Sequence, residues 1–165
     1  MKAEYDFSSE SKLPEDQLRP STGNYRSHAD AKASTEVPTQ FIWEQAIDTG
    51  NFMNWLGVRF PALPQKFSRG TILDGDGVKG VVGHCQPNYS FHLYFDNNLL
   101  VIEAGSNSSG AGPDSVRLCL DIFYSSRIAW LLANEGKQKA RVENLLQRFI
   151  KYCEEQYAKA ARNVQ

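Results

Sequence analysis

The pattern of apolar and polar residues is most regular between Tyr89 and Tyr124. Over residues 90–95 the two kinds alternate, which is typical of a half-buried strand because successive side chains of a strand point to opposite faces. The segments 99–104 and 116–124 extend this pattern, so we predict three antiparallel strands that share one apolar face. The side chains expected to be buried together on that face are Phe91, Leu93, Phe95, Leu100, Ile102, Leu118, Leu120 and Ile122.

Asn97-Asn98 is the predicted turn between the first two of these strands, because asparagine tolerates positive φ better than most residues. A two-residue turn at this position fixes which residues of the two strands face each other. A shift by one residue would mix the two faces, so the turn and the alternation support the same register. On the polar face, this register places His92 directly opposite Glu103.

Helical and strand signals also precede these three strands. A first helix is predicted after Pro38, with Thr39 as its N-cap. A short helical turn over residues 52–56 is expected to end at Gly57, since glycine is the residue most often found just past a helix end. Residues 71–84 contain two β-like segments around an Asp-Gly turn, which predicts a further hairpin.

Two helices are predicted after the third strand. Ser125 or Ser126 can cap the first of them, which covers residues 127–134. The second extends to about residue 161, with apolar residues at three- and four-residue spacing. That spacing predicts an amphipathic helix that packs on the sheet.

Residues 1–38 differ in composition from the rest of the chain. They consist largely of Ser, Asp, Glu, Lys and Pro, with few large apolar residues, which predicts a disordered N-terminal tail. The tail either carries anchors for a partner or only keeps the protein in solution. Residues 39–165 are predicted to form a single α+β domain, in which an antiparallel sheet of four to five strands packs against an N-terminal helix and a C-terminal helical pair.

Length and composition narrow the class of protein. The 165 residues suffice for one domain with a substantial core, and 41% hydrophobic with 22% charged residues is ordinary for a globular protein. No apolar run approaches the ~20 residues of a membrane-spanning helix, so we expect no membrane partner. The net charge of −1 gives no overall basic field that would attract nucleic acid.

Cys85, Cys119 and Cys153 are odd in number and widely spaced, which predicts reduced thiols in a cytoplasmic protein rather than a disulfide framework. No two of them have the spacing of zinc ligands, so we expect no metal site. The glycine-rich segment 105–113 lacks the lysine and the following helix of a phosphate-binding loop, and we expect no cofactor.

The polar face of the predicted sheet holds the candidate chemistry. A histidine oriented by a carboxylate can act as a general base, so His92 and Glu103 are the catalytic candidates. The alternative is a solvent-facing ion pair, which is common on exposed sheet faces. Tyr94, Arg117 and Asp121 share this face and are candidate binding residues.

The chain shows no established catalytic motif, so we expect a non-catalytic domain that binds another protein, as an inhibitor, immunity factor, chaperone or adaptor. A nucleic-acid-binding protein is the first alternative, because the last predicted helix is rich in Lys and Arg, with Lys139 and Arg141 as candidates for phosphate contacts. The second alternative is a small hydrolase that uses His92 and Glu103. Self-association is compatible with each of these functions.

Overall fold

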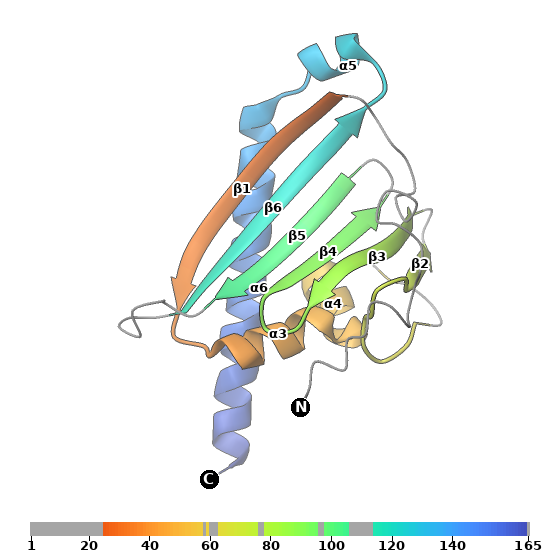
Figure 1. The fold of residues 1–165 in the computed structure, drawn as a ribbon. Helices are drawn as coiled ribbons and strands as arrows, with labels where there is room; N and C mark the ends of the chain where they lie inside the picture. Colours follow the sequence, from red (N-terminus) through yellow and green to blue (C-terminus); the bar gives the residue numbers. More distant parts are fainter. Residues whose placement is uncertain are drawn as a thin grey trace.

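The computed structural model describes residues 25–57, 59, 63–75, 78–95, 98–105 and 114–164. The elements in chain order are β1 (Tyr25–Thr35), α3 (Thr39–Ile47), α4 (Thr49–Leu56), β2 (Ile72–Gly75), β3 (Val78–Gln86), β4 (Ser90–Phe95), β5 (Asn98–Gly105), β6 (Asp114–Tyr124), α5 (Arg127–Leu131) and α6 (Glu135–Asn163). Within these residues the strands form a six-stranded antiparallel sheet in the order β1-β6-β5-β4-β3-β2 (Figure 1). The predicted α+β class is therefore confirmed.

The helices cover one face of this sheet. The long helix α6 crosses that face and contacts β1 and β6, while α3 and α4 lie on the same side and contact β5 and α6, respectively (Figure 1). The short helix α5 lies beyond the end of β1 and β6, at the opposite end of the sheet from α3. The sheet face away from α6 carries none of the described helices.

The apolar face predicted from the alternation is the face that α6 covers. Phe91 and Leu93 of β4 are 0% and 2% exposed and lie in the main core. Of the eight side chains predicted to be buried together, Phe95 and Ile122 are partly buried and pack against that core, and the other six are fully buried. Phe149 of α6 is also fully buried there, so the amphipathic stripe of α6 faces the sheet as predicted.

Strand β1 is the largest departure from the sequence prediction. The predicted disordered tail extends through residue 38, whereas residues 25–35 form an edge strand paired along its whole length with β6. Three of the four buried positions of β1 are serine or alanine rather than the large β-branched or aromatic residues typical of strands, and this hides the strand signal. These small side chains, which face α6, are Ser27, Ala29 and Ala31. The domain therefore includes residues 25–38, and β1 raises the number of strands above the predicted four to five.

The β4–β5 hairpin has a different register from the predicted one. Phe95 pairs with Asn98, so the connecting residues are 96 and 97, which lie outside the described residues, rather than Asn97-Asn98. The shift amounts to two residues, and the faces of a strand repeat every two residues. Each side chain therefore keeps its predicted face, but its cross-strand neighbour changes.

Two of the three predicted helix caps are confirmed by the structure, and the third is not. Ser126 accepts a hydrogen bond from a backbone amide at the start of α5, as predicted, and Gly57 ends α4 with a φ of 82°. Thr39, the predicted N-cap of the first helix, instead lies inside α3. Its backbone N–H and its hydroxyl both donate to the Asp114 carboxylate, at 2.8 and 2.7 Å. A carboxylate from β6 thus caps α3, which the local sequence does not reveal.

Candidate functional site

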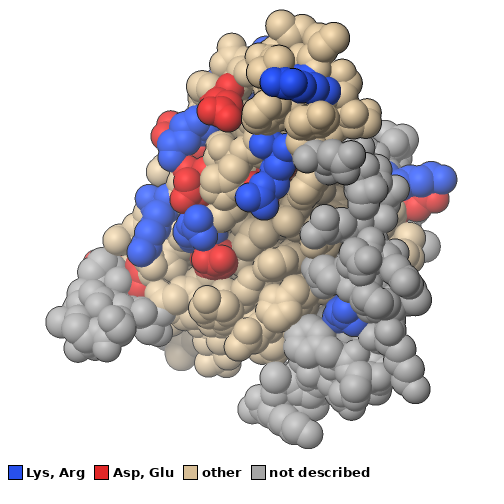
Figure 2. All heavy atoms as spheres, turned by 45° about the horizontal axis from the view of Figure 1, so that its top comes forward, with Lys and Arg blue, Asp and Glu red and all other residues tan. Residues whose placement is uncertain are grey.

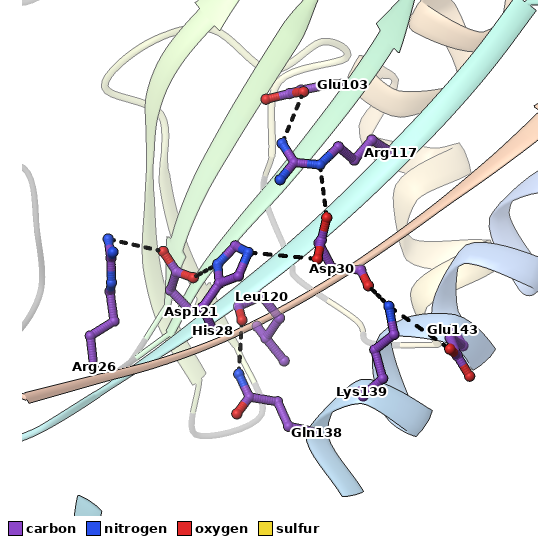
Figure 3. Close-up of polar contacts among 10 residues, drawn as sticks. All are labelled: Arg26, His28, Asp30, Glu103, Arg117, Leu120, Asp121, Gln138, Lys139 and Glu143. Carbon is purple, nitrogen blue, oxygen red and sulfur yellow. Dashed lines mark hydrogen bonds and ion pairs between the residues drawn. The ribbon is translucent and has the colours of Figure 1, made fainter. Parts of the chain in front are cut away.

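The sheet face away from α6 carries interspersed cationic and anionic side chains, which Figure 2 shows over one half of the sheet. Alternation along β1 places its charged residues on this face, because its small residues point toward α6. These side chains join charged residues of β5 and β6 in a chain of polar contacts (Figure 3). We call this group the outer-face ion network; its members are Arg26, His28, Asp30, Glu103, Arg117 and Asp121.

Arg117 lies between two carboxylates of the outer-face ion network, those of Asp30 and Glu103. Its Nε donates to Asp30 Oδ2 at 3.1 Å, and one terminal nitrogen donates to Glu103 Oε2 at 3.4 Å. The hydrogen bond from Arg117 lowers the pKa of Asp30 below its ordinary value, and the same bond raises the pKa of Arg117. Both side chains are thereby held in their charged forms.

His28 connects the two halves of the network. Its Nδ1 contacts Asp121 Oδ1, and its Nε2 lies 3.8 Å from Asp30 Oδ1. Asp121, whose side chain is 11% exposed, also faces Arg26 at 3.6 Å. Both ring nitrogens of His28 therefore face carboxylates, an arrangement that orients the ring and does not place it against a nucleophile.

His92 and Glu103, the predicted catalytic pair, are not directly opposite each other in the sheet. In the observed register, His92 is opposite Val101 and Glu103 is opposite Ser90. Glu103 interacts with Arg117 instead, and the His92 ring lies 5.1 Å from the ring of His84. The physical reason is the two-residue shift of the hairpin, which moves Glu103 from the position opposite His92 to the position opposite Ser90.

Each of the three cysteines is a buried thiol outside any disulfide. Burial raises the pKa of Cys119, which lies on the outer face, to about 11, and it raises the pKa of Cys153 to about 12. With these raised pKa values, both thiols are protonated at neutral pH. Because the thiolate is the reactive form of cysteine, both are then unreactive. Among the residues described, no group of His, Cys, Asp and Glu is arranged to hold a metal ion.

The five predicted binding residues do not form one site. Tyr94 is 3% exposed and packs with Val81, so its side chain is buried. Arg117 and Asp121 lie in the outer-face ion network. Lys139 and Arg141 lie on α6, where Lys139 Nζ contacts Asp30 O and lies 3.9 Å from the Glu143 carboxylate. The structure therefore divides the set between the outer face and α6, with Tyr94 buried.

Most basic residues of α6 lie on one stripe of its solvent side. At ~100° per residue, six of them fall within about 80° of one another, whereas Lys139 points the opposite way. We call these six the α6 basic stripe: Lys137, Arg141, Arg148, Lys151, Lys159 and Arg162, all of them exposed. Glu155 is the acidic residue that falls among them. The stripe extends from the first to the last turn of the helix.

An apolar surface at α5 was missed by the sequence reasoning. Ile128, Leu131 and Leu132 are 71%, 63% and 79% exposed, and we call them the α5 apolar patch. Leu131 and Leu132 of the patch also line a cavity of about 490 Å³, which residues 130–135 form. The sequence shows an apolar run here, but it does not show that a helix of only five residues would extend past the sheet and bury none of its side chains.

Trp130 fixes α5 to the sheet. Its ring stacks on Tyr25 with the centroids 5.7 Å apart, and its Nε1 donates to the backbone oxygen of Arg26 at 3.0 Å. Both partners belong to β1. The α5 apolar patch is therefore presented on a helix that an aromatic side chain anchors to the edge strand.

No described helix is long and apolar enough to cross a membrane.

Comparisons with known proteins show the fold and no family. No protein-family model matches the chain, and neither does any curated protein. Among solved structures, the protein MLL2253 from Mesorhizobium loti is similar with a TM-score of 0.56 at 12% identity, over 78% of this chain and 98% of that one.

Two further structures show the same likeness. SSP2350 from Staphylococcus saprophyticus has a TM-score of 0.55 at 16% identity, over 78% of this chain and 92% of that one. CalU16 from Micromonospora echinospora has a TM-score of 0.54 at 10% identity, over 84% and 90% of the two chains. At these identities, the likeness shows a shared α+β fold with an antiparallel sheet and helices.

Proposed function

We propose that the protein is a non-catalytic domain that binds another protein, and that the α5 apolar patch is its contact surface. The exposure of Ile128, Leu131 and Leu132 carries this proposal, because each is more than 60% exposed. Ile128 and Leu131 belong to α5 and Leu132 is its C-cap, and α5 lies beyond one end of the sheet (Figure 1). Large apolar patches on a protein surface mark interaction sites, because the contact of apolar side chains with water is unfavourable.

The way in which α5 is held also supports a binding role. The stacking of Trp130 on Tyr25 and its hydrogen bond to β1 restrain α5 before any partner arrives. A restrained contact surface loses little conformational entropy on binding, and this favours affinity. The cavity of about 490 Å³ beside the patch can receive an apolar side chain of the partner.

The chemistry of the sheet surface favours binding over catalysis. His28 is held between carboxylates, Glu103 is held by Arg117, and the buried thiol of Cys119 is protonated at neutral pH. None of these arrangements places a nucleophile next to a base, which nucleophilic catalysis requires. The observed register does not place Glu103 opposite His92, as the proposed hydrolase pair would require.

Affinity purification with matched variants tests this proposal. The full chain and the Leu131→Asp/Leu132→Asp variant are used as baits in nuclease-treated lysate, and Ala160→Asp/Ala161→Asp on the exposed end of α6 is the control. We expect a protein that the wild type and the control retain, and whose measured affinity falls at least about tenfold in the patch variant. Equal retention by all three baits would contradict the proposal. Sedimentation of the bait alone separates a second copy of this chain from a different partner.

A nucleic-acid-binding function is the second candidate, and the α6 basic stripe is the observation that favours it. If four of its six cations contact duplex phosphates, the slope of log K against log salt should be near −3.6, at about −0.9 per phosphate. Binding should then be lost in Lys137→Glu/Arg141→Glu, with Lys139→Glu on the other side of α6 as the control. Binding that is weak and independent of these residues would leave the stripe as a solvated helix surface.

A further inference from the structure

A cavity of about 280 Å³ lies between α4 and α6, apart from the α5 apolar patch. Its lining residues are Asn54, Trp55, Arg148, Lys151, Tyr152 and Glu155. We propose that this cavity binds a phosphate group, which Trp55, Arg148 and Lys151 hold. The inference does not depend on the proposed protein partner, because the two sites share no residue.

Trp55 contributes a buried hydrogen-bond donor without an acceptor. The residue is 2% exposed, and its Nε1 is buried with no hydrogen-bond partner. Its ring packs against Phe52 and Phe149, with centroids 5.3 and 4.9 Å away, which fixes the position of the indole. A buried N–H group without a partner is unfavourable and rare. Because Trp55 lines the cavity, a ligand acceptor atom that reaches this N–H would stabilise the arrangement.

Arg148 and Lys151 supply the charge. They lie three residues apart on α6, so their side chains are neighbours on the same side of the helix. Neither takes part in an ion pair or hydrogen bond with the residues described, in contrast to Arg117 on the outer face. A terminal nitrogen of Arg148 lies 3.5 Å from where a Cβ at Gly57 would be, so its guanidinium extends across to the end of α4.

The set of donors suits a phosphate better than a smaller anion. An indole N–H, a guanidinium and an ammonium offer donors from three side chains, and a phosphate monoester presents three charged or acceptor oxygens. With Glu155 included, the lining carries two cations and one carboxylate, which leaves a positive surplus. The volume exceeds what a phosphate group needs, so part of the molecule that carries the phosphate also fits.

Side chains of both α4 and α6 line the cavity. The hydroxyl of Tyr152 on α6 donates to Asn51 Oδ1 on α4 at 2.6 Å, which links the helices beside the cavity. The phosphate has two potential sources, because Arg148 and Lys151 also belong to the α6 basic stripe. It can belong to a small phosphorylated molecule or to the backbone of a nucleic acid, and the two sources need separate experiments.

An NMR titration of the indole resonance of Trp55 tests the site. Inorganic phosphate is added to the full chain while sodium chloride keeps the ionic strength constant, and Trp55→Phe identifies the resonance. We expect a saturable shift of this resonance, and an affinity about tenfold lower in Arg148→Gln/Lys151→Gln, which removes two charge-assisted contacts. The control Lys159→Gln/Arg162→Gln lies on the same stripe away from the cavity and should change the affinity less than about twofold.

The outcomes distinguish specific binding of phosphate in the cavity from its nonspecific electrostatic attraction to the α6 basic stripe. A resonance that stays in place, or equal weakening in both double variants, would overturn the proposal. Glycerol phosphate and a short single-stranded oligonucleotide are then titrated in the same way. Tighter binding of glycerol phosphate than of inorganic phosphate assigns the phosphate to a small molecule, and tighter binding of the oligonucleotide, with the same dependence on Arg148 and Lys151, assigns it to a nucleic acid.

Discussion

Ser27 donates a buried hydrogen bond of 2.7 Å to Gln138, a residue 111 positions further along the chain. The amide nitrogen of Gln138 donates in turn to the backbone oxygen of Leu120 at 2.8 Å (Figure 3). One side chain of α6 thus links β1 and β6, and it does so at a position where Gln138 is only 4% exposed. Strand β1, which the sequence pattern did not predict, is therefore hydrogen-bonded to helix α6, which the pattern did predict.

Replacement of Gln138 by alanine should weaken this link. The Gln138→Ala variant removes the partner of the buried Ser27 hydroxyl, and we expect the free energy of unfolding to fall by about 1–3 kcal/mol. Urea denaturation followed by circular dichroism measures this change. Gln147→Ala, on the exposed side of the same helix, is the control and should stay within about 0.5 kcal/mol of wild type. Equal stability of the two variants would show that the link contributes nothing.

The two faces of β1 should respond differently to a new charge. Ala31 faces α6 and is 8% exposed, whereas its neighbour Lys32 is exposed on the opposite face. Ala31→Asp buries a carboxylate without a partner, and we expect a loss of roughly 3 kcal/mol or more. Lys32→Asp should cost far less. Thermal unfolding of both variants gives the comparison, and similar melting temperatures would mean that residues 25–35 are not part of the folded domain.

The fold could be predicted from the sequence wherever large apolar residues set the period. Phe91, Leu93 and the apolar residues of β6 define their own faces, and both helices after β6 follow from spacing and capping. Strand β1 could not be predicted in this way because three of its four buried positions are alanine or serine. The burial of such small side chains follows from the packing of α6 on β1, which the local sequence does not show. The predicted β4–β5 register was wrong because a turn at residues 96–97 and a turn at residues 97–98 give the same faces. Moving the turn by one residue shifts the pairing by two, and the faces of a strand repeat every two residues, so the alternation cannot distinguish the two turns.

The acidity of Asp30 should depend on Arg117. Its pKa lies below the ordinary value of 3.8 mainly because Arg117 donates a hydrogen bond to it. A carboxyl with a lowered pKa in the folded state adds stability that is present above the unfolded pKa and lost as the pH falls through the folded pKa. NMR titration of the carboxyl carbon should therefore show the pKa rising in Arg117→Gln and staying unchanged in Lys32→Gln. An identical pKa in all three proteins would remove the Arg117 contact from the account.

The cysteines should be inert until the protein unfolds. Burial raises the pKa of Cys119 from 9.0 to about 11 and that of Cys153 to about 12, so the folded state favours the thiol form. The stability from these raised values is fully present below the unfolded pKa and is lost as the pH rises through the folded pKa values. At pH 8 the rate of modification by an aromatic disulfide reagent should follow the unfolded fraction as urea is added. Fast modification of the native protein would show that these thiols are accessible.

The candidate sites were less predictable than the fold, for reasons that are also physical. Arg117 and Asp121 were placed on the correct face by alternation alone, but their partners Asp30 and His28 lie on a strand 87 and 93 residues away in sequence. The α5 apolar patch is exposed because α5 lies beyond the ends of β1 and β6, and the position of these ends depends on the whole fold. Local patterns predict the face on which a side chain lies, whereas long-range pairing decides what it contacts.

Site-specific photo-crosslinking tests the proposed protein-binding surface most directly. A photoreactive phenylalanine analogue replaces Leu132 in the α5 apolar patch, or Ala160 at the exposed end of α6, in the otherwise unchanged full chain. Irradiation in native lysate should yield a discrete adduct with a second protein from position 132 and not from position 160. No adduct from position 132, or the same adducts from both positions, would contradict the account that α5 presents the binding surface.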